Sequence, residues 1–92
     1  MQYRYDKAKK ALNLKKHGFD FDDAKQVIEG AKSLTFEDGR FDYGEQRFIT
    51  LGLLHDLLVV IVTSETENEI RIISMRKADK HEQAIYYANQ ND

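Results

Sequence analysis

Three apolar runs follow one another closely in the second half of the chain, and they restrict its fold more than any other feature. The runs are RFITLGLL (47–54), LLVVIVTS (57–64) and EIRIISM (69–75). Each has the length and the content of β-branched residues that are typical of a strand. The pair His55-Asp56 suits a tight hairpin between the first two runs, although the favoured glycine is absent. With a turn at TEN (66–68), the pattern predicts an antiparallel meander.

The first third of the chain is predicted to add a short strand and two helices. Residues 2–5 alternate enough for a strand, and Asp6 is a suitable N-cap for the helix KAKKALNLKKH that follows. Gly18 can end this helix, because glycine adopts the left-handed C′ conformation at little cost. A second helix is expected from Asp20 to Gly30. Since so few residues join the two helices, we expect a helical hairpin.

A last helix is expected to begin near Asp79, because Asp79 and Glu82 have the spacing of a capping box. With a short strand at 33–36, the order of elements is strand, two helices, strands and a helix. This order is typical of an α+β domain with its helices on one face of an antiparallel sheet. We expect residues 1–92 to form a single domain. The other face of the sheet can then stay partly open to a ligand.

Composition excludes several kinds of site. The chain has no cysteine, so neither a disulfide nor a cysteine-based zinc site can form. The three histidines lack the spacing of metal ligands, and the acidic run FDFDDA (19–24) is better explained by first-turn acids that suit the helix dipole. We therefore expect no metal and no cofactor. The longest apolar run (57–62) is far short of the ~18 residues of a membrane span. We expect a cytoplasmic protein that does not bind membranes.

Charge is distributed unevenly along the chain. The net charge is −2, yet residues 1–18 contain six Lys or Arg residues and one Asp, which gives +5. Residues 19–45 contain three basic and eight acidic residues, which gives −5. A local basic patch attracts a polyanion even when the whole chain is nearly neutral.

Three stretches of the chain carry a family resemblance. They are NLKKHGFDFDDA (13–24), DYGEQRFITLG (42–52) and RIISMRKA (71–78). Together, and in this order, they resemble the BrnT family of bacterial toxins, the toxin halves of type II toxin–antitoxin pairs. The resemblance extends from Tyr5 to Tyr87, and Met75 stands where the family usually has alanine.

The resemblance implies a fold, an activity and a partner. BrnT proteins are similar in fold to the RelE ribonuclease toxins, which have a compact antiparallel sheet with helices on one side. The implied activity is a metal-independent endoribonuclease that cleaves RNA and arrests translation and growth. The implied partner is a BrnA-like antitoxin whose ribbon-helix-helix dimer binds operator DNA, so that the toxin reaches DNA only through it, in a 2:2 complex.

Two arginines near the end of the third run are the first catalytic candidates. Cleavage by the 2′-hydroxyl needs cations that stabilise the phosphorane, together with a base and an acid. The planar guanidinium groups of Arg71 and Arg76 can each bind two phosphate oxygens. The structural alternative is that these arginines form ion pairs with Glu65, Glu69 or Glu82.

His17 and Glu65 are the candidates for proton transfer. Imidazole changes its charge near neutral pH, so His17 suits a general acid or base, or else it caps the first helix. Glu65 would be a base near Arg71 if the hairpin closes at 66–68. The further RNA-binding candidates are Lys15, Lys16, Tyr43, Arg47 and Lys77.

Two of these residues have specific alternatives. Tyr43 could stack on an unpaired base or pack within its loop. For Glu45 and Arg47 we favour a structural ion pair over a catalytic base. The competing function for the whole chain is a non-catalytic module that binds a nucleic-acid-binding or regulatory protein. Such a module needs cations but no titrating group beside them.

Overall fold

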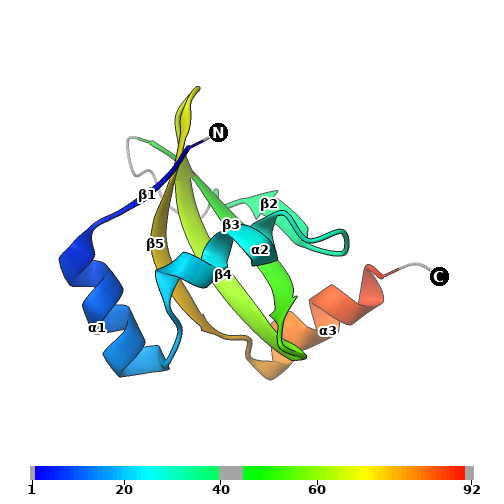
Figure 1. Cartoon of the computed structure of the whole chain (residues 1–92). Helices are drawn as coiled ribbons and strands as arrows, with labels where there is room; N and C mark the ends of the chain where they lie inside the picture. Colours follow the sequence, from blue (N-terminus) through cyan, green and yellow to red (C-terminus); the bar gives the residue numbers. More distant parts are fainter. Residues whose placement is uncertain (1, 40–44, 91–92) are drawn as a thin grey trace.

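The computed structural model describes residues 2–39 and 45–90 (Figure 1). Its elements are β1 (Gln2–Tyr5), α1 (Lys7–His17), the 3-10 helix η1 (Phe21–Asp23), α2 (Ala24–Ile28), β2 (Leu34–Glu37), β3 (Gln46–Leu54), β4 (Leu57–Glu65), β5 (Glu69–Lys77) and α3 (Lys80–Ala88). None of the helices in this part of the chain is long and apolar enough to cross a membrane.

The predicted meander is confirmed. The strand order in the sheet is β1-β5-β4-β3-β2, and β2, β3, β4 and β5 pair antiparallel in turn. His55 and Asp56 form the tight turn between β3 and β4, and both have positive φ angles, 50° and 67°. A two-residue turn of this hand matches the twist of the strands, which is why both residues accept the left-handed conformation.

The prediction of a purely antiparallel sheet is wrong, because β1 pairs parallel with β5, from Gln2↔Glu69 to Tyr5↔Ile72. The sheet is therefore mixed. About two thirds of the chain separates these two strands, so no turn between them sets their direction. The residue pattern of a short strand specifies which side chains face the core, but not which neighbour it pairs with.

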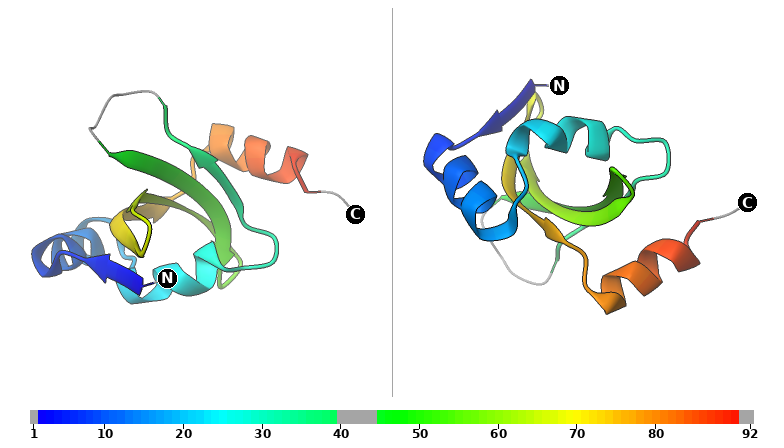
Figure 2. Two further views of the ribbon diagram at one scale, coloured as in Figure 1. Left: turned by 90° about the horizontal axis from the view of Figure 1, so that it is seen from above. Right: turned by 60° about the horizontal axis from the view of Figure 1, so that its bottom comes forward.

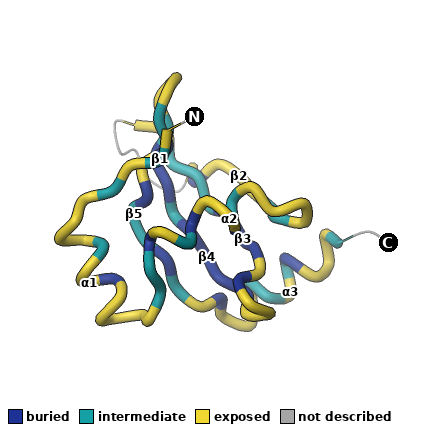
Figure 3. Tube along the Cα trace, in the orientation of Figure 1, coloured by how far each residue is buried: buried dark blue, intermediate teal, exposed yellow. Residues whose placement is uncertain are grey.

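The helices do not all lie on one face of the sheet, which corrects the second part of the predicted architecture (Figure 2). On one face, Val27 of α2 packs with Val59 and Ile61 of β4. On the opposite face, Tyr86 of α3 packs with Val60 of the same strand. Side chains alternate along a strand, so the unbroken apolar run of β4 supplies both cores. Figure 3 shows the buried positions concentrated in these central strands.

The predicted caps are confirmed, but the helical hairpin does not form as a packed pair. Gly18 ends α1 with φ 78°, and Asp20 caps the next turn, which begins as the 3-10 helix η1. The second helix ends at Ile28 rather than Gly30. α1 packs mainly against β5 and α2 against β3, so each helix finds its main partner in the sheet.

A single buried side chain attaches α1 to the sheet. The Asn13 amide nitrogen donates to the carbonyl oxygens of Met75 (2.9 Å) and Phe19 (3.1 Å). Its amide oxygen accepts from the Met75 backbone N–H at 3.1 Å. The pairing of β1 with β5 ends at Ile72, so Asn13 takes the place that a further strand residue would occupy on this edge.

We expect Asn13→Asp to destabilise the fold by about 3 kcal/mol, because a carboxylate of the same size cannot donate to the two carbonyls. The measurement is the free energy of unfolding in urea. The matched control is Asn89→Asp at the exposed end of α3, where the amide donates to one carbonyl only. Equal stability of the two variants would show that Asn13 does not fix α1.

Candidate functional site

Three arginines lie in one row across the sheet. Direct neighbours across β3, β4, β5 and β1 are Arg47, Ser64, Arg71 and Arg4. Because side chains alternate along β4, Ser64 lies on the same face as Val60, which is the face that carries α3. α3 packs near Val60, and the arginine row lies further along the same strands. The prediction that this face is free of helices is wrong, because α3 covers part of it.

Arg71 is the accessible centre of this row. Its side chain is 53% exposed, and its Nη2 atom lies 3.6 Å from Glu45 Oε1. The same Glu45 oxygen accepts from Arg47 Nε at 3.4 Å and Nη2 at 3.3 Å. The predicted pair of Glu45 with Arg47 is confirmed, and the carboxylate is shared with Arg71. At such long distances between partly exposed side chains, these contacts are weak.

Arg76 has a different environment, although only five residues separate it from Arg71. Its Nη1 and Nη2 atoms donate to the two carboxylate oxygens of Glu82 at 2.8 and 2.7 Å. Glu82 also accepts from the Asp79 backbone N–H and so completes the predicted capping box of α3. The hydrogen bonds from Arg76 lower the pKa of Glu82 below its ordinary value of 4.5. Arg76 therefore links β5 to α3 through a bidentate ion pair with Glu82. This is the ion pair that was the structural alternative to phosphate binding for Arg76.

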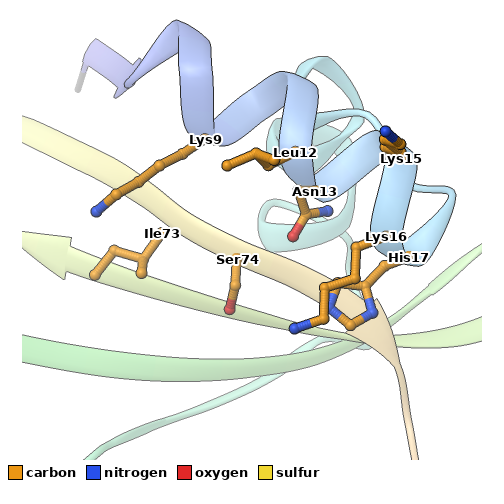
Figure 4. Close-up of a pocket in the computed structure, with 8 residues that line it drawn as sticks. All are labelled: Lys9, Leu12, Asn13, Lys15, Lys16, His17, Ile73 and Ser74. Carbon is orange, nitrogen blue, oxygen red and sulfur yellow. The ribbon is translucent and has the colours of Figure 1, made fainter.

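A groove of about 730 Å3 lies between α1 and β5 (Figure 4). Its floor is formed by Ile73 and Ser74, and its wall on α1 carries Lys9, Leu12 and Lys16. These wall positions have i, i+3 and i+7 spacing, which puts them on one helix face. Ser74 pairs with Val62, so the floor shares the sheet face of the arginine row. The groove floor and the row therefore lie on the same face of the sheet, although no residue of the row is among the described residues that line the groove.

A β-bulge shapes the floor of this groove. Val62 pairs with Ser74 and Thr63 with Ile72, so Ile73 is an extra residue in β5. The bulge lets Ile72 and Met75 both reach the core under α2, while Ile73 and Ser74 line the groove. Bulges redirect side chains in this way and are common beside functional sites.

His17 and the two predicted lysines border the groove. Figure 4 shows Lys16 and His17 reaching down to the level of Ser74, whereas Lys15 lies on the upper side of the helix. His17 thus lines the groove, whereas Arg71 is not among the described residues that line it. Their segments are more than 50 residues apart in the sequence.

Lys10 lies elsewhere. Its ammonium group binds Asp22 at 2.9 Å, and this hydrogen bond raises the pKa of Lys10 and lowers that of Asp22. Tyr5 also donates to Asp22, at 3.0 Å. Asp22 of the acidic run thus links η1 to α1, and the Lys10 ammonium group is held in this ion pair. Among residues 2–39 and 45–90, no three acidic or histidine side chains form a group that could hold a metal ion.

The structure does not bring the remaining candidates to this surface. Ser64, not Glu65, is the neighbour of Arg71, and Glu65 lies on the opposite face of the sheet, next to Ile70. Lys77 lines a separate hollow near Leu57 and Asp56. Tyr43 lies outside the described residues.

Sequence reasoning missed several residues of the surface. Lys9, Leu12 and Asn13 lie on one helix face with Lys16, and this spacing was visible in the sequence. An Asn in the middle of a predicted helix was a further signal, because this residue disfavours helix interiors unless its amide has a partner. Nothing local marked Ile73 and Ser74, since the bulge depends on the pairing of β4 with β5.

Comparison with known proteins agrees with the resemblance of the three motifs. The model of a family described as the ribonuclease toxin, BrnT, of type II toxin–antitoxin systems matches residues 5–82. A search of curated proteins finds no match.

We expect Arg76→Ala to destabilise the protein by about 1 kcal/mol at pH 7, near the lower end for charged hydrogen bonds because Arg76 is partly exposed. The folded-state pKa of Glu82 is depressed, so the contribution of the pair is complete above pH 4.5 and is lost as the pH falls through that lower pKa. The difference in unfolding free energy between wild type and variant should therefore shrink as the pH is lowered below 4.5.

Arg4→Ala is the control for this series. Arg4 pairs with Glu69 at 2.7 Å, but both side chains are exposed, so we expect almost no change at any pH. A difference between wild type and Arg76→Ala that did not shrink at all as the pH fell below 4.5 would contradict the assignment.

Proposed function

The chain belongs to the BrnT family of ribonuclease toxins of type II toxin–antitoxin systems, and we propose that it is a metal-independent endoribonuclease that arrests translation and growth. The observation that carries the proposal is the Arg71 side chain, which is 53% exposed in a row of arginines across the sheet; a groove lined by His17 supports it. Its place of action would be the cytoplasm, where messenger RNA is translated.

The proposed reaction uses the RNA's own 2′-hydroxyl as the nucleophile. A base takes the hydroxyl proton, the oxygen attacks the adjacent phosphorus, and the bond from phosphorus to the 5′ oxygen breaks. An acid then protonates the leaving 5′ oxygen, which yields a 2′,3′-cyclic phosphate and a free 5′-hydroxyl. The transition state carries extra negative charge on the phosphoryl oxygens, where a fixed guanidinium is most effective.

We assign charge stabilisation to Arg71 and proton transfer to Glu45 and His17. Arg71 projects from a central strand, so the sheet holds its position, and its guanidinium can bond two phosphoryl oxygens. Glu45 lies within ion-pair distance of Arg71, at 3.6 Å, and in the proposed mechanism it takes the role first considered for Glu65. Arg47 orients Glu45 and adds positive charge to the same surface.

We expect Arg71→Ala to lower the rate of RNA cleavage about 100- to 1,000-fold, the usual cost of one transition-state donor, with little change in unfolding free energy. Expression of the wild-type toxin alone should arrest growth, and this variant should relieve the arrest. Lys32→Ala, in the turn between α2 and β2, is the control and should cleave RNA like the wild type. A soluble Arg71→Ala variant of full toxicity would remove the proposed site.

Cleavage should continue in excess EDTA, because the proposed acid and base are side chains. The measurement is the appearance of cyclic-phosphate ends on a labelled RNA with and without the chelator. If EDTA abolishes cleavage and added Mg²⁺ restores it, the proposed mechanism is wrong.

We propose that the antitoxin of this pair is BrnA-like and covers the arginine row. Its ribbon-helix-helix dimer would bridge two toxins in a 2:2 complex and would make all contacts with operator DNA. An inhibitor that neutralises Arg71 must lose affinity when the charge is inverted. In a binding titration, Arg71→Glu should weaken the complex at least tenfold, and Lys32→Glu should not. Equal affinity of the two variants would place the antitoxin elsewhere.

A further inference from the structure

The groove between α1 and β5 combines charge, apolar walls and a free hydroxyl in a way that fits one ligand class. We propose that it binds one unpaired nucleotide of a single-stranded RNA, with the base against Leu12 and Ile73 and the neighbouring phosphates on Lys9 and Lys16. This inference rests on the ribonuclease function proposed above and names the form of substrate that the site accepts.

The charge of the groove points to a polyanion. Lys9, Lys15 and Lys16 all border it, and none of its described lining residues is acidic. This contrasts with the net charge of −2 for the whole chain. Lys10 lies on the same helix but forms an ion pair with Asp22. The three lysines of the groove, by comparison, make no ion pair within the described residues.

The apolar walls point to a base rather than to phosphate alone. Leu12 is 65% exposed on α1, and across from it Ile73 is only partly buried, although both are large aliphatic side chains. A planar base between them would remove apolar surface from water on both of its faces. The bulge in β5 is what turns Ile73 toward this space.

A polar group at the bottom of the groove can read the edge of such a base. Ser74 is partly buried, and within the described part of the chain its hydroxyl makes no hydrogen bond. A hydroxyl both donates and accepts, so it can bond to any base edge, and its position on the sheet restricts which base fits. Figure 4 shows Ser74 below Asn13, between Lys9 and Lys16.

The size of the groove selects an unpaired nucleotide. Its volume of about 730 Å3 is within the range of about 300–1,000 Å3 for sites that bind small molecules. A base stacked in a duplex cannot enter a space walled by one helix and one strand. Sequence-specific proteins likewise read RNA mostly through bases of single-stranded segments.

The test is a binding titration that does not depend on cleavage. The probe is a short, fluorescein-labelled RNA whose 2′-hydroxyls are replaced by fluorine, so that it cannot be cut. Anisotropy should show that wild type binds the single strand at least tenfold more tightly than the same sequence in a duplex. Leu12→Asp should weaken binding of the single strand about tenfold, since it removes an apolar wall and adds a negative charge.

Two matched controls stand on the same helix. Leu14 is also exposed but does not line the groove, so Leu14→Asp should bind the probe within twofold of wild type.

Lys9→Ala with Lys16→Ala should reduce the slope of log affinity against log salt by about 1.4, as expected for two lost phosphate contacts on a single strand. Lys7→Ala, which lies outside the groove, should leave the slope unchanged. Ser74→Ala should change the preference among four probes of different base composition.

The outcomes separate this inference from the proposed function. Tight binding of the uncleavable probe by a protein that never cuts natural RNA would defeat the ribonuclease proposal alone. Equal effects of Leu12→Asp and Leu14→Asp, equal binding of duplex and single strand, or no binding of the probe would overturn the groove assignment. So would displacement of the probe by poly-glutamate of equal charge, because the groove would then be a site for an acidic protein segment.

Discussion

The position of α1 against the sheet depends on the side-chain amide of Asn13, which forms hydrogen bonds with the β5 edge as the backbone of a neighbouring strand would. β1 covers only the first half of the β5 edge, and α1 approaches where that cover ends. Asn13 presents a donor and an acceptor at the spacing of a peptide group, and it satisfies both backbone groups of Met75. Because a buried backbone group without a partner is costly, this pairing fixes how close α1 lies to the sheet and at which residue. The groove beside it follows, since the helix face that carries Asn13 also carries the side chains of the groove wall.

The second constraint is that β4 is apolar on both faces. The sheet must then be covered on both sides, by η1 and α2 on one and by α3 on the other. α2 comes so close to β3 that a Cβ atom on Gly52 would lie 2.7 Å from Val27 Cγ1. α3 is short and covers only part of its face. The rest of this face carries the arginines of the row and Ser64, together with the partly exposed Val62 and Phe36.

Arg71 and Arg76 of β5 show that two residues of the same type can differ in their ion-pair partners because of the tertiary structure around them. Both were expected to bind phosphate, and both have carboxylate neighbours. Arg76 meets Glu82 with two short hydrogen bonds at the first turn of α3, so its charge is used inside the fold. Within the described residues, Arg71 makes one long contact, to Glu45, and its side chain is about half exposed. The distances, rather than the residue types, therefore distinguish the environments of the two guanidinium groups.

The sequence by itself determined the features that depend on near neighbours along the chain. These are the meander with its His55-Asp56 turn, the caps at Asp6 and Gly18, the capping box before α3, and the family to which the chain belongs. Short-range hydrogen bonds and backbone preferences specify such features, so a local pattern is enough. Only the tertiary structure decided the parallel β1, the placement of helices on both faces, the bulge at Ile73 and the neighbours of Arg71. Each of these depends on which distant segment supplies a hydrogen-bond partner, and the sequence pattern of one strand or helix does not contain that information.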